Sequence, residues 1–157
     1  YQYFNTSSRS HSVPILFGNY QKTGGRYRAE NTVWNGKTFS YDYASAYDDE
    51  RVTSLKRFID VDKKGITVRN QITFAEGFTP SAGDYIERYV LTEKPQIEQG
   101  KLIAGGVVAT YKGADLPTVS VEMVTPHNPA EGDYPVYLVD FSVQGTEFEI
   151  RIEPQAK

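Results

Sequence analysis

The sequence predicts an all-β fold, an antiparallel β-sandwich of about ten strands, formed by residues 1–157 as a single domain. The length of 157 residues suits one domain, since domains typically contain about 100 to 200 residues. Aromatic residues make up 13% of the chain, and most are Tyr or Phe, which favour strands. Segments with a period of two recur along the chain between short turns rich in Gly, Asn and Asp. No segment has the pattern of a helix longer than one or two turns.

The N-terminal half contains five expected strands. The first is a short apolar run that ends at the turn residues Gly18-Asn19. The dipeptide Asn35-Gly36 lies between two alternating segments, which predicts a type I′ hairpin. A second hairpin is expected around Lys63-Lys64-Gly65. These strands cover residues 13–17, 26–33, a segment that begins at 38, 52–61 and 66–74.

The C-terminal half contains five more. The segment Pro80 to Asp84 has the composition of a loop and separates the two halves. Gly105-Gly106 lies inside one apolar run and predicts a bulge or a sharp bend there. The expected strands cover residues 85–91, 101–111, 118–124, 136–143 and 148–152.

Composition and charge exclude several classes of function. The chain has no Cys, so a disulfide scaffold, a thiolate zinc site and a Cys nucleophile are excluded. Residues 1–40 contain five cations and one anion, a net +4, whereas residues 41–157 contain 12 cations and 19 anions, a net −7. An acidic domain is a poor candidate for nucleic acid, and no apolar run reaches the roughly 20 residues of a membrane span. The basic first quarter indicates either an anionic partner or a chance cluster on solvated strand edges.

Few residues offer recognisable chemistry. The two histidines are His11, in a hydroxyl-rich segment that enters the first strand, and His127, in a Pro-rich surface loop. His11 is either a structural residue that is hydrogen bonded at a strand start or part of a site. Serines flank it, but no nucleophile elbow of the form Gly-x-Ser-x-Gly is present. Asp48-Asp49-Glu50 lacks the ligand order of a calcium loop and is interpreted as a charged turn.

One stretch resembles a known family. Residues 8–21, Ser-Arg-Ser-His-Ser-Val-Pro-Ile-Leu-Phe-Gly-Asn-Tyr-Gln, resemble the hallmark segment of the heparinase II/III-like polysaccharide lyases. In that family a His precedes a small polar residue, a strand and a turn that ends in Gln. Residues 26–29, 42–47 and 55–61 are also similar to the β domain of these lyases. The likeness is strongest in the first half of the chain.

The resemblance implies a fold and a reaction. Members of the family pair an N-terminal α/α toroid with a C-terminal antiparallel β-sandwich, and the active site lies between the two domains. The reaction is β-elimination, in which a base removes the C5 proton of a uronic acid and the 4-O-glycosidic bond breaks. Because the chain begins at Tyr1, it is expected to be this second domain of a larger protein, inactive alone. The compartment stays open: secreted, periplasmic or cytoplasmic.

The resemblance also assigns residues. It implies a catalytic role for His11 and Arg9. It implies contacts with the acidic polysaccharide for Arg26, Arg28, Tyr20 and Gln21. In several members the His of this segment, which is His11 here, is also a zinc ligand. The other ligands, a His and an Asp, would precede this chain. Since a structural zinc site needs about four ligands, no zinc is expected in residues 1–157 alone, although the full-length protein could hold one.

Two further expectations concern partners. An apolar surface that normally packs on the toroid would be exposed in this chain, where it could form a homodimer. The alternative function is a non-catalytic carbohydrate-binding or structural β-sandwich. Such a module would expose coplanar rings of Trp34 and nearby tyrosines, whereas a lyase domain would cluster His11, Arg9 and Arg28 at one edge.

Overall fold

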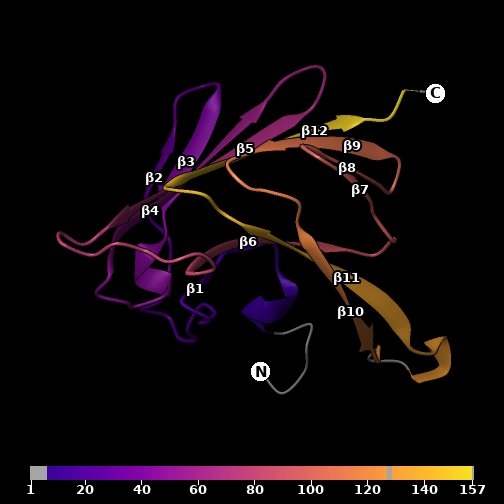
Figure 1. Cartoon of the computed structure of the whole chain (residues 1–157), viewed down its shortest axis with the longest axis horizontal. Coiled ribbons are helices and arrows are strands. Elements are labelled where there is room, and N and C mark those ends of the chain that lie inside the picture. The colour runs from indigo at the N-terminus through magenta and orange to yellow at the C-terminus, as the bar shows by residue number, and fades with distance from the viewer. Residues whose placement is uncertain (1–6, 127–128, 157) are drawn as a thin grey trace.

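A computed structural model describes residues 7–126 and 129–156, and it confirms the all-β sandwich. About 53% of the chain is strand and 5% is helix, and two antiparallel sheets pack against each other. In Figure 1 the larger sheet forms the upper layer and the smaller sheet forms the lower layer. His127 lies outside the described residues.

Twelve strands form the two sheets in the described part of the chain. The smaller sheet has the order β1-β6-β11-β10, and the larger has the order β2-β3-β4-β5-β12-β9-β8-β7. The strands are β1 (Ile15–Leu16), β2 (Glu30–Trp34), β3 (Thr38–Asp42), β4 (Val52–Val61), β5 (Ile66–Phe74), β6 (Tyr85–Leu91), β7 (Gln96–Glu98), β8 (Lys101–Ala104), β9 (Val107–Lys112), β10 (Thr118–Val124), β11 (Tyr134–Ser142) and β12 (Glu147–Pro154). Three 3-10 turns, η2 (Ser8–Ser10), η3 (Ala44–Ala46) and η4 (Pro129–Glu131), complete the described elements.

The structure differs from the sequence prediction at several strands, and the first of them is shorter than expected, since β1 covers only Ile15–Leu16 of residues 13–17. The expected strand 101–111 is a hairpin, because Gly105 and Gly106 both adopt positive φ and reverse the chain between β8 and β9. The short strand β7 was missed, since three residues are too few to show a period of two. The expected strand 26–33 begins only at Glu30.

The hairpin around Asn35 and Gly36 is confirmed, but its type I′ turn is wrong. A type I′ turn needs positive φ at both central residues, whereas only Gly36 has it, at 89°. The Oδ1 atom of Asn35 instead accepts hydrogen bonds from the backbone N–H groups of Lys37 and Thr38, at 3.0 and 2.8 Å. The side chain of Asn35 therefore stabilises this turn through hydrogen bonds to the backbone.

Aromatic rings fill the core between the sheets. Phe141 of β11 and Phe148 of β12 are fully buried, and their ring centroids lie 5.1 Å apart. Tyr111 of β9 packs edge-on to Phe141 at 4.7 Å, and Tyr89 of β6 does so at 6.0 Å. Because each ring comes from a different strand, this cluster joins the two sheets.

Polar residues lie beside the apolar core on the inner face of the larger sheet. The strand register places Tyr41, Arg57, Asn70 and Phe148 side by side across β3, β4, β5 and β12. Directly paired residues of an antiparallel sheet share a face, so Arg57 and Asn70 point into the sandwich with the buried Phe148. A charged side chain therefore lies inside the sandwich, next to the segment that carries His11.

Gly113 should not tolerate a side chain. Its φ is +88°, and a Cβ atom placed there would lie 2.2 Å from the carbonyl oxygen of Glu147. Gly113→Ala is therefore expected to lower the free energy of unfolding by about 1 to 3 kcal/mol, measured by urea denaturation. Gly18→Ala is a matched control, because Gly18 also has positive φ but faces open space. Equal losses in the two variants would show that backbone strain, and not the contact with Glu147, sets the effect.

Candidate functional site

His11 lines a groove of about 360 Å³. We call it the His11 groove. The groove is lined by Ser8, His11, Gln21, Lys22, Thr23, Gly24, Gly25 and Tyr27. Of these groove residues, His11 is exposed and Gln21 is half-buried.

Hydrogen bonds attach the far wall of the groove to the turn after β3. The backbone N–H of Lys22 donates to the carbonyl of Ala46 at 2.8 Å, and the Ser45 hydroxyl donates to the carbonyl of Arg28 at 2.6 Å. The Nζ atom of Lys22 lies 2.9 Å from Oδ2 of Asp48. Residues 22–28 have no strand of their own, so these contacts fix the position of the wall.

A basic and aromatic cluster forms one side of the groove. The guanidinium of Arg26 lies 4.6 Å from the ring centroid of Tyr27 and donates a hydrogen bond to its hydroxyl. Lys22 lies 5.8 Å from the same ring. A phenol beside two cations and an imidazole can accept, hold or donate a proton next to an anionic ligand.

The six residues assigned from the resemblance do not all meet at this groove. His11 and Gln21 line it, and Arg26 contacts it through Tyr27. The other three lie elsewhere: Arg9 forms an ion pair with Glu122 of β10, the hydroxyl of Tyr20 accepts a hydrogen bond from Arg88, and Arg28 is exposed. Lys22 and Tyr27 were missed by the sequence reasoning, although Tyr27 lies between two arginines in Arg-Tyr-Arg.

The chain itself neutralises part of its basic first quarter. Two of the five cations in residues 1–40, Arg9 and Lys22, pair with Glu122 and Asp48. Within the described residues the other three, Arg26, Arg28 and Lys37, form no ion pair and are exposed. Of the two cations at the groove, Lys22 is paired with the carboxylate of Asp48 and Arg26 lies on the ring of Tyr27.

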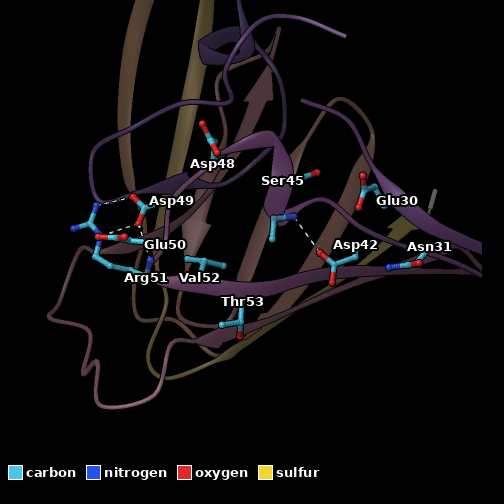
Figure 2. A pocket seen from close by; sticks show the side chains of 11 residues that line it. Glu30, Asn31, Asp42, Ser45, Asp48, Asp49, Glu50, Arg51, Val52 and Thr53 are labelled. Atoms are coloured by element: carbon cyan, nitrogen blue, oxygen red, sulfur yellow. Dashed lines mark hydrogen bonds and ion pairs between the residues drawn. The ribbon is translucent and has the colours of Figure 1, made fainter. Parts of the chain in front are cut away.

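A larger pocket of about 840 Å³ lies on the other side of Asp48. Figure 2 shows Glu30 of β2 and Asp42 of β3 at one end of this pocket and Asp49 beside Arg51 at the other, with Asp48 between them. We call it the acidic pocket. It is lined by Glu30, Asn31, Asp42, Ala44, Ser45, Asp48, Asp49, Glu50, Arg51, Val52 and Thr53.

Most carboxylates of the acidic pocket already have partners within the chain. Asp42 accepts hydrogen bonds from the Ser54 hydroxyl at 2.5 Å and from two backbone N–H groups. Burial opposes the charge of Asp42, yet these hydrogen bonds hold its pKa below the ordinary value. A hydrogen bond from Arg51 likewise lowers the pKa of Asp49. The pocket thus carries negative charge at neutral pH and suits no anionic ligand, and residues 48–50 are the charged turn that the sequence predicted.

A buried polar cluster lies between the sheets behind the His11 groove. Its carboxylate is Glu87 of β6, which is 0% exposed and accepts a hydrogen bond from the Tyr85 hydroxyl at 2.5 Å. Arg57 of β4 lies 3.5 Å from Oε2 of Glu87 and donates through Nε to Asn70 at 2.8 Å. Burial raises the pKa of Glu87, and the charge of Arg57 acts in the opposite direction. The sequence signal for this cluster was the pair Glu87-Arg88 inside an otherwise apolar strand.

The structure offers no metal site around His11. Among residues 7–126 and 129–156, no three His, Asp or Glu side chains gather as ligands. The charged neighbour of His11 in the groove is the cation Lys22, which disfavours a second cation. These residues do not fit a zinc site, so no chemistry is assigned to zinc. No helix in the described part of the chain is long and apolar enough to span a membrane.

No protein-family model matches the chain, and no curated protein matches it. The functional argument therefore depends on the His11 groove, on its charges and on the sequence resemblance described above.

Proposed function

We propose that this chain is the β-sandwich domain of a heparinase II/III-like polysaccharide lyase, which cleaves uronic-acid-containing glycans by β-elimination. In this proposal the His11 groove forms one wall of the substrate cleft. An N-terminal α/α toroid supplies the opposite wall and the remaining catalytic groups, so residues 1–157 alone are inactive.

One observation carries the proposal: His11 and Gln21, which belong to the resembling segment, share a groove with a cation and a phenol. The nine intervening residues, 12–20, include a strand and a tight turn that bring His11 and Gln21 together, and the Ser8 hydroxyl donates to the carbonyl of Gln21 at 3.2 Å. A set of imidazole, amide, ammonium and phenol groups is suited to a sugar that carries a carboxylate.

The groove residues have distinct roles in such a reaction. Removal of the C5 proton sends its electron pair into a C4=C5 double bond, while the C4–O bond breaks and the leaving oxygen takes a proton. Negative charge builds on the uronate carboxylate before the bond breaks, and in this proposal Lys22, which lines the groove, and Arg26, which lies on the ring of Tyr27, stabilise that charge. His11 and Tyr27 are the groups of the groove that can exchange a proton with the sugar.

Exposed apolar residues on β10 support a partner domain. Val119 pairs with the buried Val139, which in turn pairs with Tyr89, so Val119 lies on the inner face of the smaller sheet. Val121 and Met123 follow on the same face, yet they are 55% and 61% exposed. This stripe is the surface that we assign to the toroid, or to a second copy when the toroid is absent.

The test uses the gene product that contains this chain together with residues 1–157 alone. Both are incubated with heparan sulfate, alginate and hyaluronate, and the ultraviolet absorbance of the unsaturated uronate product is followed. We expect product from the longer protein only. His11→Ala in the longer protein is expected to lower kcat/KM by about a hundredfold or more, the usual contribution of a general acid or base.

Lys37→Ala provides the matched control for this experiment. Lys37 is another exposed cation of the first 40 residues, but it lies at the turn between β2 and β3 and not in the groove. Its loss should leave kcat/KM unchanged. Absence of product on all three polymers, or equal effects of the two substitutions, would contradict the proposal.

A second candidate function is non-catalytic glycan binding, and the exposure of Trp34 favours it. Trp34 of β2 is 64% exposed and pairs with Phe39 of β3, which is also partly exposed. Sugar rings stack on such surfaces. However, the next rings along this face are tilted, with 52° between Phe39 and Tyr41. Glycan binding that Trp34→Ala abolishes and His11→Ala leaves intact would favour this candidate.

A further inference from the structure

The segment that carries His11 has almost no secondary structure of its own. It contains a three-residue 3-10 turn, Ser8–Ser10, followed by an extended run into β1. Its internal hydrogen bonds are short-range: the N–H of His11 donates to the carbonyl of Ser8, and the N–H of Val13 donates to that of His11. Such a segment needs contacts with the rest of the fold to hold an exposed side chain in one place.

The first such contact is made by Arg88 of β6. Its side chain is 7% exposed and forms a two-pronged ion pair with Asp140 of β11, with both N–O distances 2.7 Å. The Nη1 atom of Arg88 is directed to the N-terminal segment, where it donates to the carbonyl of Arg9 and to the hydroxyl of Tyr20, each at 3.3 Å. One guanidinium thus binds both ends of the stretch from residue 9 to residue 20.

The second contact comes from the buried polar cluster. Arg57 is 11% exposed, and its Nη1 atom donates to the carbonyl of Ser12 at 3.1 Å. The hydroxyl of Ser12 in turn accepts a hydrogen bond from the backbone N–H of Val90 at 3.2 Å. Ser12 is therefore fixed by β4 through its carbonyl and by β6 through its side chain.

These contacts lie on both sides of His11. Arg88 binds the carbonyl two residues before it, and Arg57 binds the carbonyl one residue after it. A buried guanidinium must satisfy its five N–H donors. Breaking these hydrogen bonds would leave a buried donor without an acceptor and would lower the stability of the fold. The carboxylates that orient the two arginines, Asp140 and Glu87, belong to neighbouring strands of the smaller sheet.

We infer that Arg88 and Arg57 are positioning residues: they fix the backbone on both sides of His11, so that its imidazole projects into the His11 groove. The importance of that placement for catalysis rests on the proposed function, but the placement itself does not. Two ion pairs therefore set the geometry of an exposed site. The pair of Arg57 and Glu87 lies inside the sandwich, whereas the pair of Arg88 and Asp140 lies on the opposite face of the smaller sheet, under the segment that carries His11.

Arg88→Lys in residues 1–157 tests the inference. Lysine keeps the charge opposite Asp140, but it cannot form the two-pronged ion pair and also reach Arg9 and Tyr20. We expect the amide hydrogens of Ser10, His11 and Val13 to exchange about tenfold faster, because a charged hydrogen bond that holds the segment is lost. The ring resonances of His11 should shift in the NMR spectrum, whereas core amides such as that of Phe141 should keep their exchange rates.

Arg151→Lys is the matched control. Arg151 of β12 also pairs with two carboxylates, Asp62 and Glu153, but it makes no contact with the His11 segment among the described residues. If Arg88→Lys does not fold, Asp140→Asn replaces it, since this change releases the guanidinium of Arg88 and keeps the side-chain shape. Unchanged exchange at His11, or equal acceleration in the Arg151 variant, would overturn the inference.

A glycan titration separates this inference from the proposed function. Heparan sulfate, alginate and hyaluronate oligosaccharides are added to the unsubstituted chain and to the Arg88→Lys variant. Faster exchange at His11 together with weaker glycan binding supports both proposals. Faster exchange without glycan binding in either protein supports the positioning role and counts against the lyase cleft.

Discussion

Replacing Arg57 by Met is expected to lower the free energy of unfolding by about 3 to 5 kcal/mol at pH 8, because it leaves the carboxylate of Glu87 buried without a counter-charge. Met fills a similar volume, so the loss does not arise from a cavity. The substitution also removes the hydrogen bonds to Asn70 and to the Ser12 carbonyl. Urea denaturation of the 157-residue chain measures the change.

The pH dependence gives this prediction its sign. Burial raises the pKa of Glu87 in the folded chain, and the loss of Arg57 removes the main opposing effect. A group whose pKa is higher in the folded state stabilises the fold below its unfolded pKa, and this contribution is lost as the pH rises through the folded value. The difference between Arg57→Met and the unsubstituted chain should therefore shrink as the pH is lowered from 8 to 5, where Glu87 can become neutral.

The double variant Arg57→Met with Glu87→Gln completes the cycle. Glu87→Gln alone leaves Arg57 as the uncompensated charge, because a guanidinium stays protonated even when it is buried. With both charges removed, the double variant should be more stable than the sum of the single losses predicts, by about 0.5 to 3 kcal/mol. Additive losses that do not change with pH would show that the two side chains do not interact.

The fold was predictable because its signals are local. The hairpins around Asn35-Gly36 and around Lys63-Lys64-Gly65 have turn residues between alternating strands, and both pairs of strands formed as expected. The side-chain period of two is read over five to ten residues, which is the length of β4, β5 and β6. Gly105-Gly106 predicted an interruption of the strand at the right position, but the dipeptide did not show whether the strand bends there or forms a hairpin.

The candidate site was less predictable because it depends on distant contacts. His11 and Gln21 were found from a contiguous segment, and the structure brings them together. Arg9 was assigned to the same site, yet it pairs with Glu122, which is 113 residues away in the sequence. The net charge of a segment cannot show which of its cations are already paired.

The positioning residues could not be predicted either, because their directions depend on contacts between distant strands. Arg57 lies in a strand where charged residues are common on the solvent face, and the period of two alone does not show that it points inward. Its direction follows from the register with Asn70 and Phe148, which only the sheet as a whole determines. A charge inside a sandwich is the exception to the rule by which the strands were recognised.

Phe141→Ala is the second large effect that we expect, a loss of about 3 to 5 kcal/mol in the free energy of unfolding. Phe141 is fully buried and its ring contacts Tyr111, Phe148 and Tyr89 from three other strands. Truncation leaves a cavity that the rigid sheets cannot close. For a domain of this size the melting temperature should fall by about 10 °C, measured by circular dichroism.

Trp34→Ala is the matched control, since it removes a larger ring from a site that is 64% exposed. Surface substitutions change stability by about 0.5 kcal/mol or less, so this variant should unfold close to the unsubstituted chain. A loss as large as that of Phe141→Ala would show that Trp34 is packed in the domain and is not available to stack on a sugar. A small loss leaves Trp34 accessible, and glycan binding by the His11→Ala and Trp34→Ala variants then decides between the lyase cleft and the binding module.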